Sequence, residues 1–173
     1  MSDTETLPDD LFLVDVEAQR DEPAGRTLSF SRSTTVLLTF AANRFTRSAA
    51  RLYQDRFGIG AMDWRMLVML TRAPGCNAAH ASRTIGIDKA AVSRSLARLE
   101  KAGLAEAVRN SPDERRRDWW LTAKGRALHA EMLEAALDLQ RQILDGFAEE
   151  EVEQFNGYLR RALANIEALQ EQV

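Results

Sequence analysis

The amino-acid sequence predicts a mainly α-helical protein with one small β-hairpin. Apolar residues recur at intervals of three and four along several segments, the spacing that places side chains on one face of a helix. Two short segments are joined by Gly86, Ile87 and Asp88, as in a helix-turn-helix. Residues 104–122 lose this spacing and carry a polar tip between two apolar ends, which is typical of a hairpin.

The composition excludes several classes of protein. Apolar residues make up 45% of the chain and charged residues 28%, as in ordinary globular proteins. No run approaches the roughly 18 apolar residues of a membrane span, and the acidic N-terminus does not resemble a signal peptide. We therefore expect a cytoplasmic protein that does not bind membranes. One cysteine, Cys76, and two distant histidines, His80 and His129, predict no disulfide, metal or other cofactor.

The net charge of -3 is distributed unevenly. Residues 1–25 carry eight acidic side chains against Arg20 alone, and residues 131–173 carry ten against three basic ones. Residues 26–130 carry nineteen Lys and Arg against eight Asp and Glu. A basic middle segment is consistent with a face that meets a polyanion, although uneven scatter of surface charge is the alternative.

The first elements are an arm and two helices. Residues 1–30 show no useful periodicity, so we expect an acidic, partly disordered arm. Residues 31–57 form one long amphipathic stripe that Gly58 should end. Asp63–Thr71 is apolar nearly all round, which indicates a central helix before the stop at residues 74–75.

The helix-turn-helix is predicted over residues 78–85 and 89–102, with Asp88 as the N-cap of its second helix. In that helix Val92, Leu96 and Leu99 share one face, and small and basic residues point the other way. Such a face can enter a DNA major groove, because Ala allows close approach and Arg reaches base edges and phosphates. An ordinary solvated helix face is the alternative.

The hairpin should present Arg115, Arg116 and Arg117 at its tip, within one helix of that face. Arginines there can follow a duplex backbone or enter the minor groove, although an arginine run alone is often a solvated loop. Thr122 then caps a helix to about Asp145. A last helix runs from about residue 149 to 169, after a break near Gly146. Its apolar residues exceed what a small lobe can cover, which indicates a homodimer.

These segments resemble the MarR family of bacterial regulators from about residue 31 to 170. The matching residues are Trp64-Arg65, the run from Gly86 to Leu104 (GIDKAAVSRSLARLEKAGL), Asp113-Glu114-Arg115 and Leu121-Thr122-Ala123-Lys124-Gly125. The resemblance implies one domain over residues 31–173, with dimerisation helices at 31–57 and 126–170 and a winged helix-turn-helix lobe at 61–122. The residues it places toward the groove are Lys89, Ala90, Ala91, Ser93, Arg94 and Arg98.

The resemblance also implies a wing pair, in which Asp113 orients Arg115. Arg116, Arg117 and Trp119-Trp120 make this wing more basic and aromatic than the family pattern, and the arm is longer. A small-molecule pocket between dimer platform and lobe, often for aromatic acids, is implied as well. Its candidate lining residues are Arg44, Arg47, Trp64 and Met66, for which core or surface packing is the alternative.

The sequence thus predicts a homodimeric, double-stranded-DNA-binding repressor that acts on a pseudo-palindromic operator and is released by a small, possibly aromatic anionic, effector. One alternative is an oxidation-responsive regulator that senses through Cys76. Another is a protein-interaction module without an effector. An enzyme is not expected, because Ser93 and His80, the nearest candidates for catalysis, lack the spacing of a catalytic pair.

Overall fold

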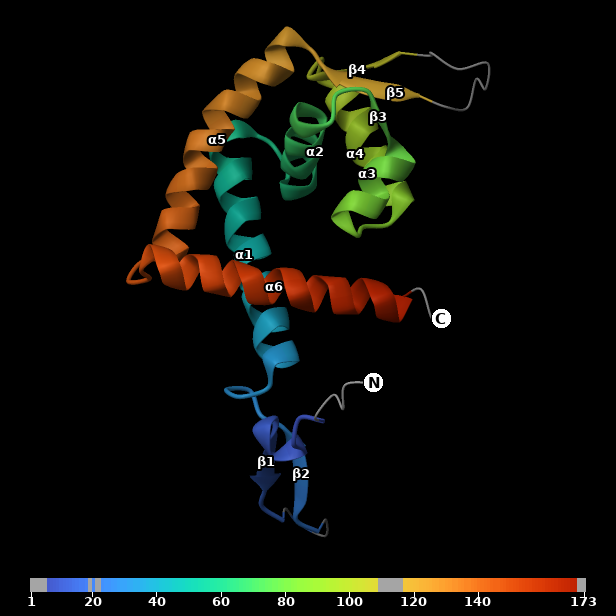
Figure 1. The fold of residues 1–173 in the computed structure, drawn as a ribbon. Coiled ribbons are helices and arrows are strands. Elements are labelled where there is room, and N and C mark those ends of the chain that lie inside the picture. Colours follow the sequence, from blue (N-terminus) through green and yellow to red (C-terminus); the bar gives the residue numbers. More distant parts are fainter. Residues whose placement is uncertain (1–5, 19, 21–22, 109–116, 171–173) are drawn as a thin grey trace. The chain divides into compact units, whose positions relative to one another are not determined.

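A computed structural model describes residues 6–18, 20, 23–108 and 117–170 of this protein (Figure 1). The chain divides into two compact units, residues 1–66 and 67–173. The first contains the 3-10 helix η1 (Asp9–Leu11), β1 (Leu13–Val16), β2 (Gly25–Leu28), α1 (Thr34–Phe57) and the first half of α2 (Ala61–Arg72). The second contains the rest of α2, β3 (Cys76–Asn77), α3 (Ala78–Ile85), α4 (Lys89–Lys101), β4 (Ala105–Val108), β5 (Asp118–Leu121), α5 (Ala123–Ile143) and α6 (Glu149–Gln170). The expected mainly helical fold with a small hairpin is confirmed.

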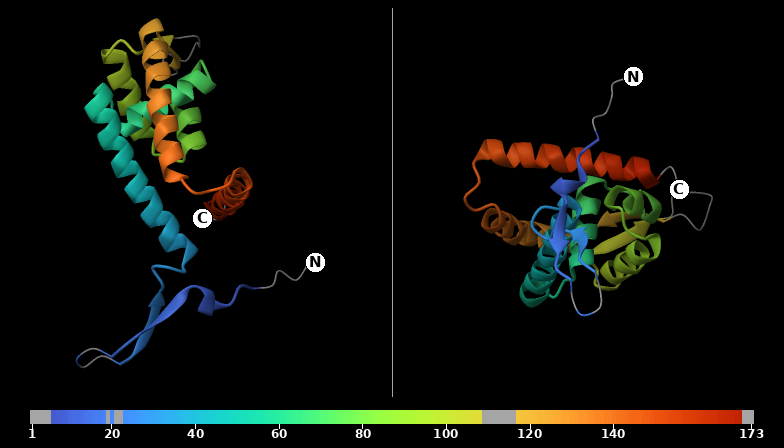
Figure 2. Two further views of the ribbon diagram at one scale, coloured as in Figure 1. Left: turned by 90° about the vertical axis from the view of Figure 1, so that its left-hand side faces the viewer. Right: turned by 90° about the horizontal axis from the view of Figure 1, so that it is seen from below.

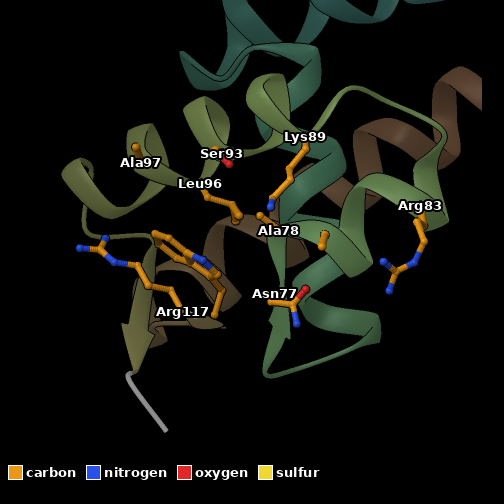
Figure 3. A pocket seen from close by; sticks show the side chains of 10 residues that line it. Asn77, Ala78, Arg83, Lys89, Ser93, Leu96, Ala97 and Arg117 are labelled. Carbon is orange, nitrogen blue, oxygen red and sulfur yellow. The ribbon is translucent and has the colours of Figure 1, made fainter. Parts of the chain in front are cut away.

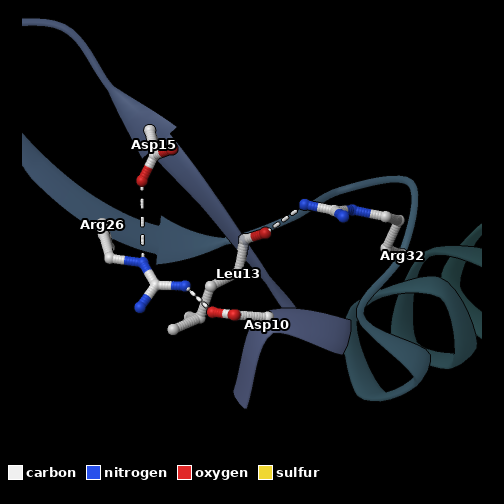
Figure 4. A network of polar contacts seen from close by, with 5 residues as sticks. All are labelled: Asp10, Leu13, Asp15, Arg26 and Arg32. Atoms are coloured by element: carbon white, nitrogen blue, oxygen red, sulfur yellow. Dashed lines mark hydrogen bonds and ion pairs between the residues drawn. The ribbon is translucent and has the colours of Figure 1, made fainter. Parts of the chain in front are cut away.

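The N-terminal segment contains a hairpin, where the sequence predicted a partly disordered arm. β1 and β2 pair antiparallel, with Leu13 opposite Leu28 and Asp15 opposite Arg26. The Arg26 guanidinium forms ion pairs with Asp10 and Asp15, and Arg32 donates a hydrogen bond to the Leu13 carbonyl (Figure 4). Figure 2 shows this ribbon continuing into the N-terminal end of α1. Four-residue strands of mixed polarity leave too little pattern for sequence reasoning to detect.

The helix α1 ends where the sequence predicts. Gly58 adopts a left-handed conformation with φ 66°, and its N–H donates to the carbonyl of Gln54, as in a glycine-terminated helix. The helix begins three residues later than expected, because Ser33 is extended and serves as the N-cap residue. Near its other end Tyr53 is buried, and its ring lies 5.6 Å from the ring of Trp64 on α2.

The helix-turn-helix forms from local signals. The Asp88 carboxylate accepts hydrogen bonds from the N–H groups of Ala90 and Ala91, so it caps α4 as predicted. Gly86 supplies the left-handed residue that ends α3, with φ 71°. The Ser82 hydroxyl then donates to the Ile87 carbonyl at 2.6 Å and closes the turn. Both helix starts agree with the sequence analysis.

The wing is a three-stranded antiparallel sheet with strand order β3-β5-β4. The expected hairpin corresponds to β4 and β5, which pair Ala105 with Leu121 and Val108 with Asp118. The added strand β3 places Cys76 opposite Trp119. Its two residues are too few to show an alternating pattern, so only tertiary pairing reveals it. Trp119 is buried where the three strands meet.

The segment Leu121–Gly125 connects the wing to α5 through several hydrogen bonds. The Thr122 hydroxyl accepts from the Gly125 N–H and donates to the Gly103 carbonyl, at 3.0 and 2.8 Å. The Lys124 ammonium donates to the Ala102 carbonyl. A Cβ on Gly125 would lie 1.9 Å from the Leu104 carbonyl oxygen. Only glycine therefore fits at this position of α5.

The last helix, α6, has no buried residue. Tyr158, Leu163 and Leu169 are each more than half exposed, at 60%, 57% and 62%. Among the described residues, no helix is both long and apolar enough to cross a membrane. The exposed apolar side chains of α6 resemble those of a protein contact surface.

Candidate nucleic-acid interface

The helix α4 is divided into a buried face and an exposed face. Val92, Ser95, Leu96 and Leu99 are at most 1% exposed and hold the helix against its lobe. The residues predicted to face the groove lie on the other side. Of these, Lys89, Ala90, Ser93, Arg94 and Arg98 are exposed, and Ala91 is half-buried. The structure thus brings the α4 part of the predicted site onto one surface.

A hollow of about 680 Å³ lies beside this surface, and three of its lining side chains are cationic (Figure 3). Lys89, Ser93 and Ala97 border it from α4, and Arg83 borders it from α3. Arg117 lines the hollow immediately before β5. Arg83 could not be predicted from the sequence, because the contribution of α3 depends on how the two helices pack. The one sequence feature that points to Arg83 is its place as a basic residue in the last turn of the first short helix.

The basic side chain of Arg117, at the loop end of the β4–β5 hairpin, is paired with α4. The Arg117 guanidinium lies 3.4 Å from the carboxylate of Glu100, and both side chains remain partly exposed. Glu100 is the one acidic residue within α4. An exposed pair of this kind is weak, so a phosphate can compete with Glu100 for the arginine. Arg117 therefore lies within reach of α4.

Three predicted wing residues, Asp113, Arg115 and Arg116, lie outside the described residues. The expected orientation of Arg115 by Asp113 therefore remains a prediction. The expectation that the arginine run reaches a duplex backbone is supported here only by the location of Arg117 next to the hollow.

The thiol of Cys76 is in a poor environment for redox sensing. Cys76 is 9% exposed and pairs with Trp119 in the sheet. Burial raises the pKa of this thiol, and the neighbouring Asp118 carboxylate raises it further. Since the thiolate is the reactive form, the sulfur is kept in its less reactive protonated state at neutral pH. The geometry gives no support to the oxidation-responsive alternative.

The four candidate effector residues divide into two groups. Arg44 and Arg47 are exposed on α1, and the Arg44 guanidinium lies 5.2 Å from the ring centre of Phe40. Arg47 lines a shallow hollow of about 300 Å³ together with Ser48, Arg51 and Leu52. Trp64 and Met66 are buried, at 9% and 0% exposure. Core packing is thus sufficient to explain Trp64 and Met66, whereas the two arginines are accessible to an anion.

A helix-turn-helix followed by an antiparallel wing, with an exposed basic face on its second helix, defines a winged helix-turn-helix DNA-binding protein. Comparison with known proteins supports this class. A model of the MarR family matches residues 57–116. The HTH-type transcriptional regulator PetP of Rhodobacter capsulatus is 30% identical over 123 residues, which cover 68% of this chain and 74% of that protein. The chain therefore belongs to the MarR family of transcriptional regulators.

Solved structures share the fold. A MarR/EmrR family transcriptional regulator from Acinetobacter sp. ADP1 is 29% identical, with a TM-score of 0.75, over 82% of this chain and 99% of that one. A probable transcriptional regulator from Pseudomonas aeruginosa is 28% identical, with a TM-score of 0.62, over 72% and 96%. An E. coli MarR variant complexed with operator DNA is 22% identical, with a TM-score of 0.66, over 73% and 91%. The α4 face described above is thus part of a transcriptional regulator.

Proposed function

We propose that this regulator is a homodimeric repressor that binds a pseudo-palindromic operator through the exposed face of α4. The observation that carries the proposal is the division of α4. Its apolar side is fully buried, and its other side exposes Lys89, Arg94 and Arg98 next to small residues. Small residues let the helix backbone approach base edges, and arginine recognises guanine. The E. coli relative in complex with operator DNA supports the same use of the fold.

The roles of the basic residues follow from their positions. Arg94 lies in the middle of the exposed α4 face, where a side chain can reach a base edge. Lys89 begins α4 and Arg117 precedes β5, and both line the hollow at the edge of that face. Backbone phosphates flank the groove, so these two residues are suited to bind phosphate. The proposed wing contacts of Asp113, Arg115 and Arg116 extend the same surface.

The proposed dimer explains the exposed apolar surface of the helices outside the lobe. On α6 the side chains of Phe155, Tyr158, Leu163 and Ile166 are 42% to 60% exposed. On α1 Phe45 is 46% exposed. We assign residues 31–57 and 126–170 to the dimer platform and 61–122 to the DNA-binding lobe. A two-fold dimer would present two copies of α4 to successive major grooves about 34 to 36 Å apart.

One titration tests the proposed readout. The affinity of the full chain for promoter DNA next to its own gene is compared with its affinity for random duplex, by fluorescence anisotropy at several salt concentrations. Arg94→Ala should cost roughly 1 to 3 kcal/mol per half-site and relax the preference at one base position. Arg117→Ala should weaken binding to both duplexes alike and reduce the salt slope by about one.

Arg141→Ala provides a matched control, because Arg141 is exposed on α5 and paired with Asp138. It should leave both affinities unchanged. Equal losses on promoter and random DNA for Arg94→Ala would contradict the base-reading role. Absence of salt-dependent binding to any duplex would instead favour a protein-interaction module.

Release by an anionic small molecule completes the proposal. Arg44 and Arg47 are exposed on α1, within the proposed dimer platform. A ligand bound there need not touch α4, because a shift of a few ångströms in the spacing of the two α4 helices would misplace both from their grooves. It must bind the misaligned dimer more tightly than the aligned one. An aromatic acid combines the charge and the apolar body that such a platform can bind.

A further inference from the structure

The β1–β2 hairpin is a formed element that the proposed function leaves without a role. Its two strands have no buried residue. Val14 and Val16, on one face of the hairpin, are 41% and 39% exposed, and Leu28, on the other, is 46% exposed. A lone two-stranded hairpin is marginally stable in water. A hairpin that exposes apolar side chains on both faces is therefore expected to pack against another surface.

The hairpin is nevertheless held firmly to α1. The N–H of Ser33 donates to the carbonyl of Ser29, and both serines are at most 4% exposed. The ring of Phe30 meets that of Phe40 edge to face, with centroids 5.2 Å apart. Together with the hydrogen bond from Arg32 to the Leu13 carbonyl, these contacts fix the base of the hairpin. The hairpin thus extends from the N-terminal end of α1 as a built projection.

The unit that contains the hairpin offers little to cover it. The 24 residues of α1 rise about 36 Å, so α2 begins at the far end of that helix. In the described part of this unit, η1 packs against β1, and the first turns of α1 follow the hairpin in the chain. Those turns expose Leu37 and Leu38, at 44% and 39%. The strands and the first turns of α1 thus each leave apolar side chains exposed within this unit.

Charge indicates what covers these side chains. The segment that contains the hairpin is acidic, because residues 1–33 carry eight Asp and Glu against Arg20, Arg26 and Arg32. Two of these carboxylates, Asp10 and Asp15, already form ion pairs with Arg26. The second half of α6, residues 158–170, combines Arg160 and Arg161 with a single acidic residue, Glu167. This half also exposes Tyr158, Leu163, Ile166 and Leu169. The first half of α6 carries four glutamates, at positions 149, 150, 151 and 153, and would repel the hairpin.

We propose that the hairpin of one protomer packs on residues 158–170 of α6 in a second copy of this chain. The inference rests on the proposed dimer, since α1 and α6 both belong to its platform. The hairpin then adds an apolar and electrostatic contact at each end of the two-fold interface. Each chain contributes one hairpin and receives one, so the contact is reciprocal, as an isologous dimer requires.

A charge-swap experiment on the full chain tests this contact. One variant carries Asp9→Lys and Glu17→Lys, and the other carries Arg160→Glu and Arg161→Glu. Each variant alone should form a weaker homodimer, because both of its hairpin contacts join like charges. When the two variants are mixed, every hairpin meets an α6 of opposite charge. Native mass spectrometry should then show heterodimers well above the one half that random pairing gives.

Glu149→Lys with Glu150→Lys, in the first half of α6, should show no preference for the hairpin variant. Random pairing of the two test variants would overturn the proposal. If a chain that carries all four changes regains a stable homodimer while the two test variants still pair at random, the contact lies within one chain. That result would also overturn the proposal. If unaltered chains are monomeric, the proposed dimer itself fails. If the unaltered chain is dimeric but the two test variants pair at random, the hairpin contact is refuted and the proposed dimer is not.

Discussion

The ion pair between Arg117 and Glu100 sets the charge available at the loop end of the β4–β5 hairpin. The two groups are 3.4 Å apart and partly exposed, so the carboxylate both competes with a phosphate for the arginine and repels it. Glu100→Gln should therefore tighten binding to promoter and random DNA alike, by an amount on the order of 0.2 to 1 kcal/mol. Fluorescence anisotropy measures both affinities.

The double variant with Arg117→Ala identifies the cause. In the Arg117→Ala background, Glu100→Gln should increase the affinity for DNA by less. Only the repulsion between the Glu100 carboxylate and the phosphate then remains to be removed. Weaker DNA binding by Glu100→Gln in the presence of Arg117 would mean that Glu100 positions the arginine and does not compete for it.

The cap of α4 makes the stability of this helix sensitive to acid. Hydrogen bonds from the N–H groups of Ala90 and Ala91 hold the pKa of Asp88 below its ordinary value, with a smaller contribution from Arg94. A carboxyl whose pKa is lower in the folded state stabilises the fold above its unfolded pKa of about 3.9. That contribution is lost as the pH falls through the folded value.

Asp88→Asn separates the effect of the α4 cap from the effect of ionising the Asp88 carboxyl, because asparagine also caps helices but does not ionise. Between pH 5 and pH 3 the melting temperature of the wild type should fall more steeply than that of the variant. Circular dichroism at a series of pH values measures this difference. Parallel curves for the two proteins would show that the charge of Asp88 contributes nothing to the stability of α4.

At the scale of elements, the connection between wing and α5 depends on the close approach of Gly125 to the Leu104 carbonyl. A Cβ 1.9 Å from that oxygen cannot be accommodated without moving backbone. Gly125→Ala should lower the free energy of unfolding by roughly 1 to 3 kcal/mol or more. Chemical denaturation monitored by tryptophan fluorescence measures the loss, since Trp119 and Trp120 lie in the adjoining strand.

Gly157→Ala is the matched comparison, because it is also a helical glycine. A Cβ there meets nothing within 4 Å in this chain. Alanine should therefore stabilise α6 by up to about 1 kcal/mol through its better helix propensity. An equal loss in the free energy of unfolding for Gly125→Ala and Gly157→Ala would show that the close approach at Gly125 does not cause the destabilisation.

At the scale of the whole molecule, effector release is a linkage between two sites. If an aromatic acid lowers operator affinity tenfold, the coupling free energy is about 1.4 kcal/mol. Operator DNA must then weaken binding of that acid tenfold in return. Calorimetric titration of the free dimer and of the operator-saturated dimer measures both affinities. Arg47→Ala should lower the affinity for the acid in both the free and the operator-bound dimer, if Arg47 binds the carboxylate of the acid.

If an acid that derepresses the gene binds the free and the operator-bound protein with the same affinity, this dimer is not its target. A monomeric mass by light scattering at micromolar concentration would contradict the dimer itself. In that case the exposed apolar side chains of α6 would need a different partner.

The sequence by itself determined the elements whose signals are local. Asp88 and Gly86 mark the start and the turn of the helix-turn-helix, and Gly58 marks the end of α1, because caps and glycine-terminated helices depend on residues a few positions apart. The buried face of α4 could be predicted for the same reason. Periodicity alone places Val92, Leu96 and Leu99 on one side, and the structure buries all three.

The tertiary structure decided what depends on residues far apart in the chain. The strand β3 exists only because Cys76 meets Trp119, and the N-terminal hairpin only because Leu13 meets Leu28. Likewise, the arrangement of Arg83 and Arg117 around one hollow follows from the packing of α3, α4 and the wing. Helical hydrogen bonds link neighbours four residues apart. Strand pairing and the assembly of a site depend on long-range contacts that no local pattern encodes.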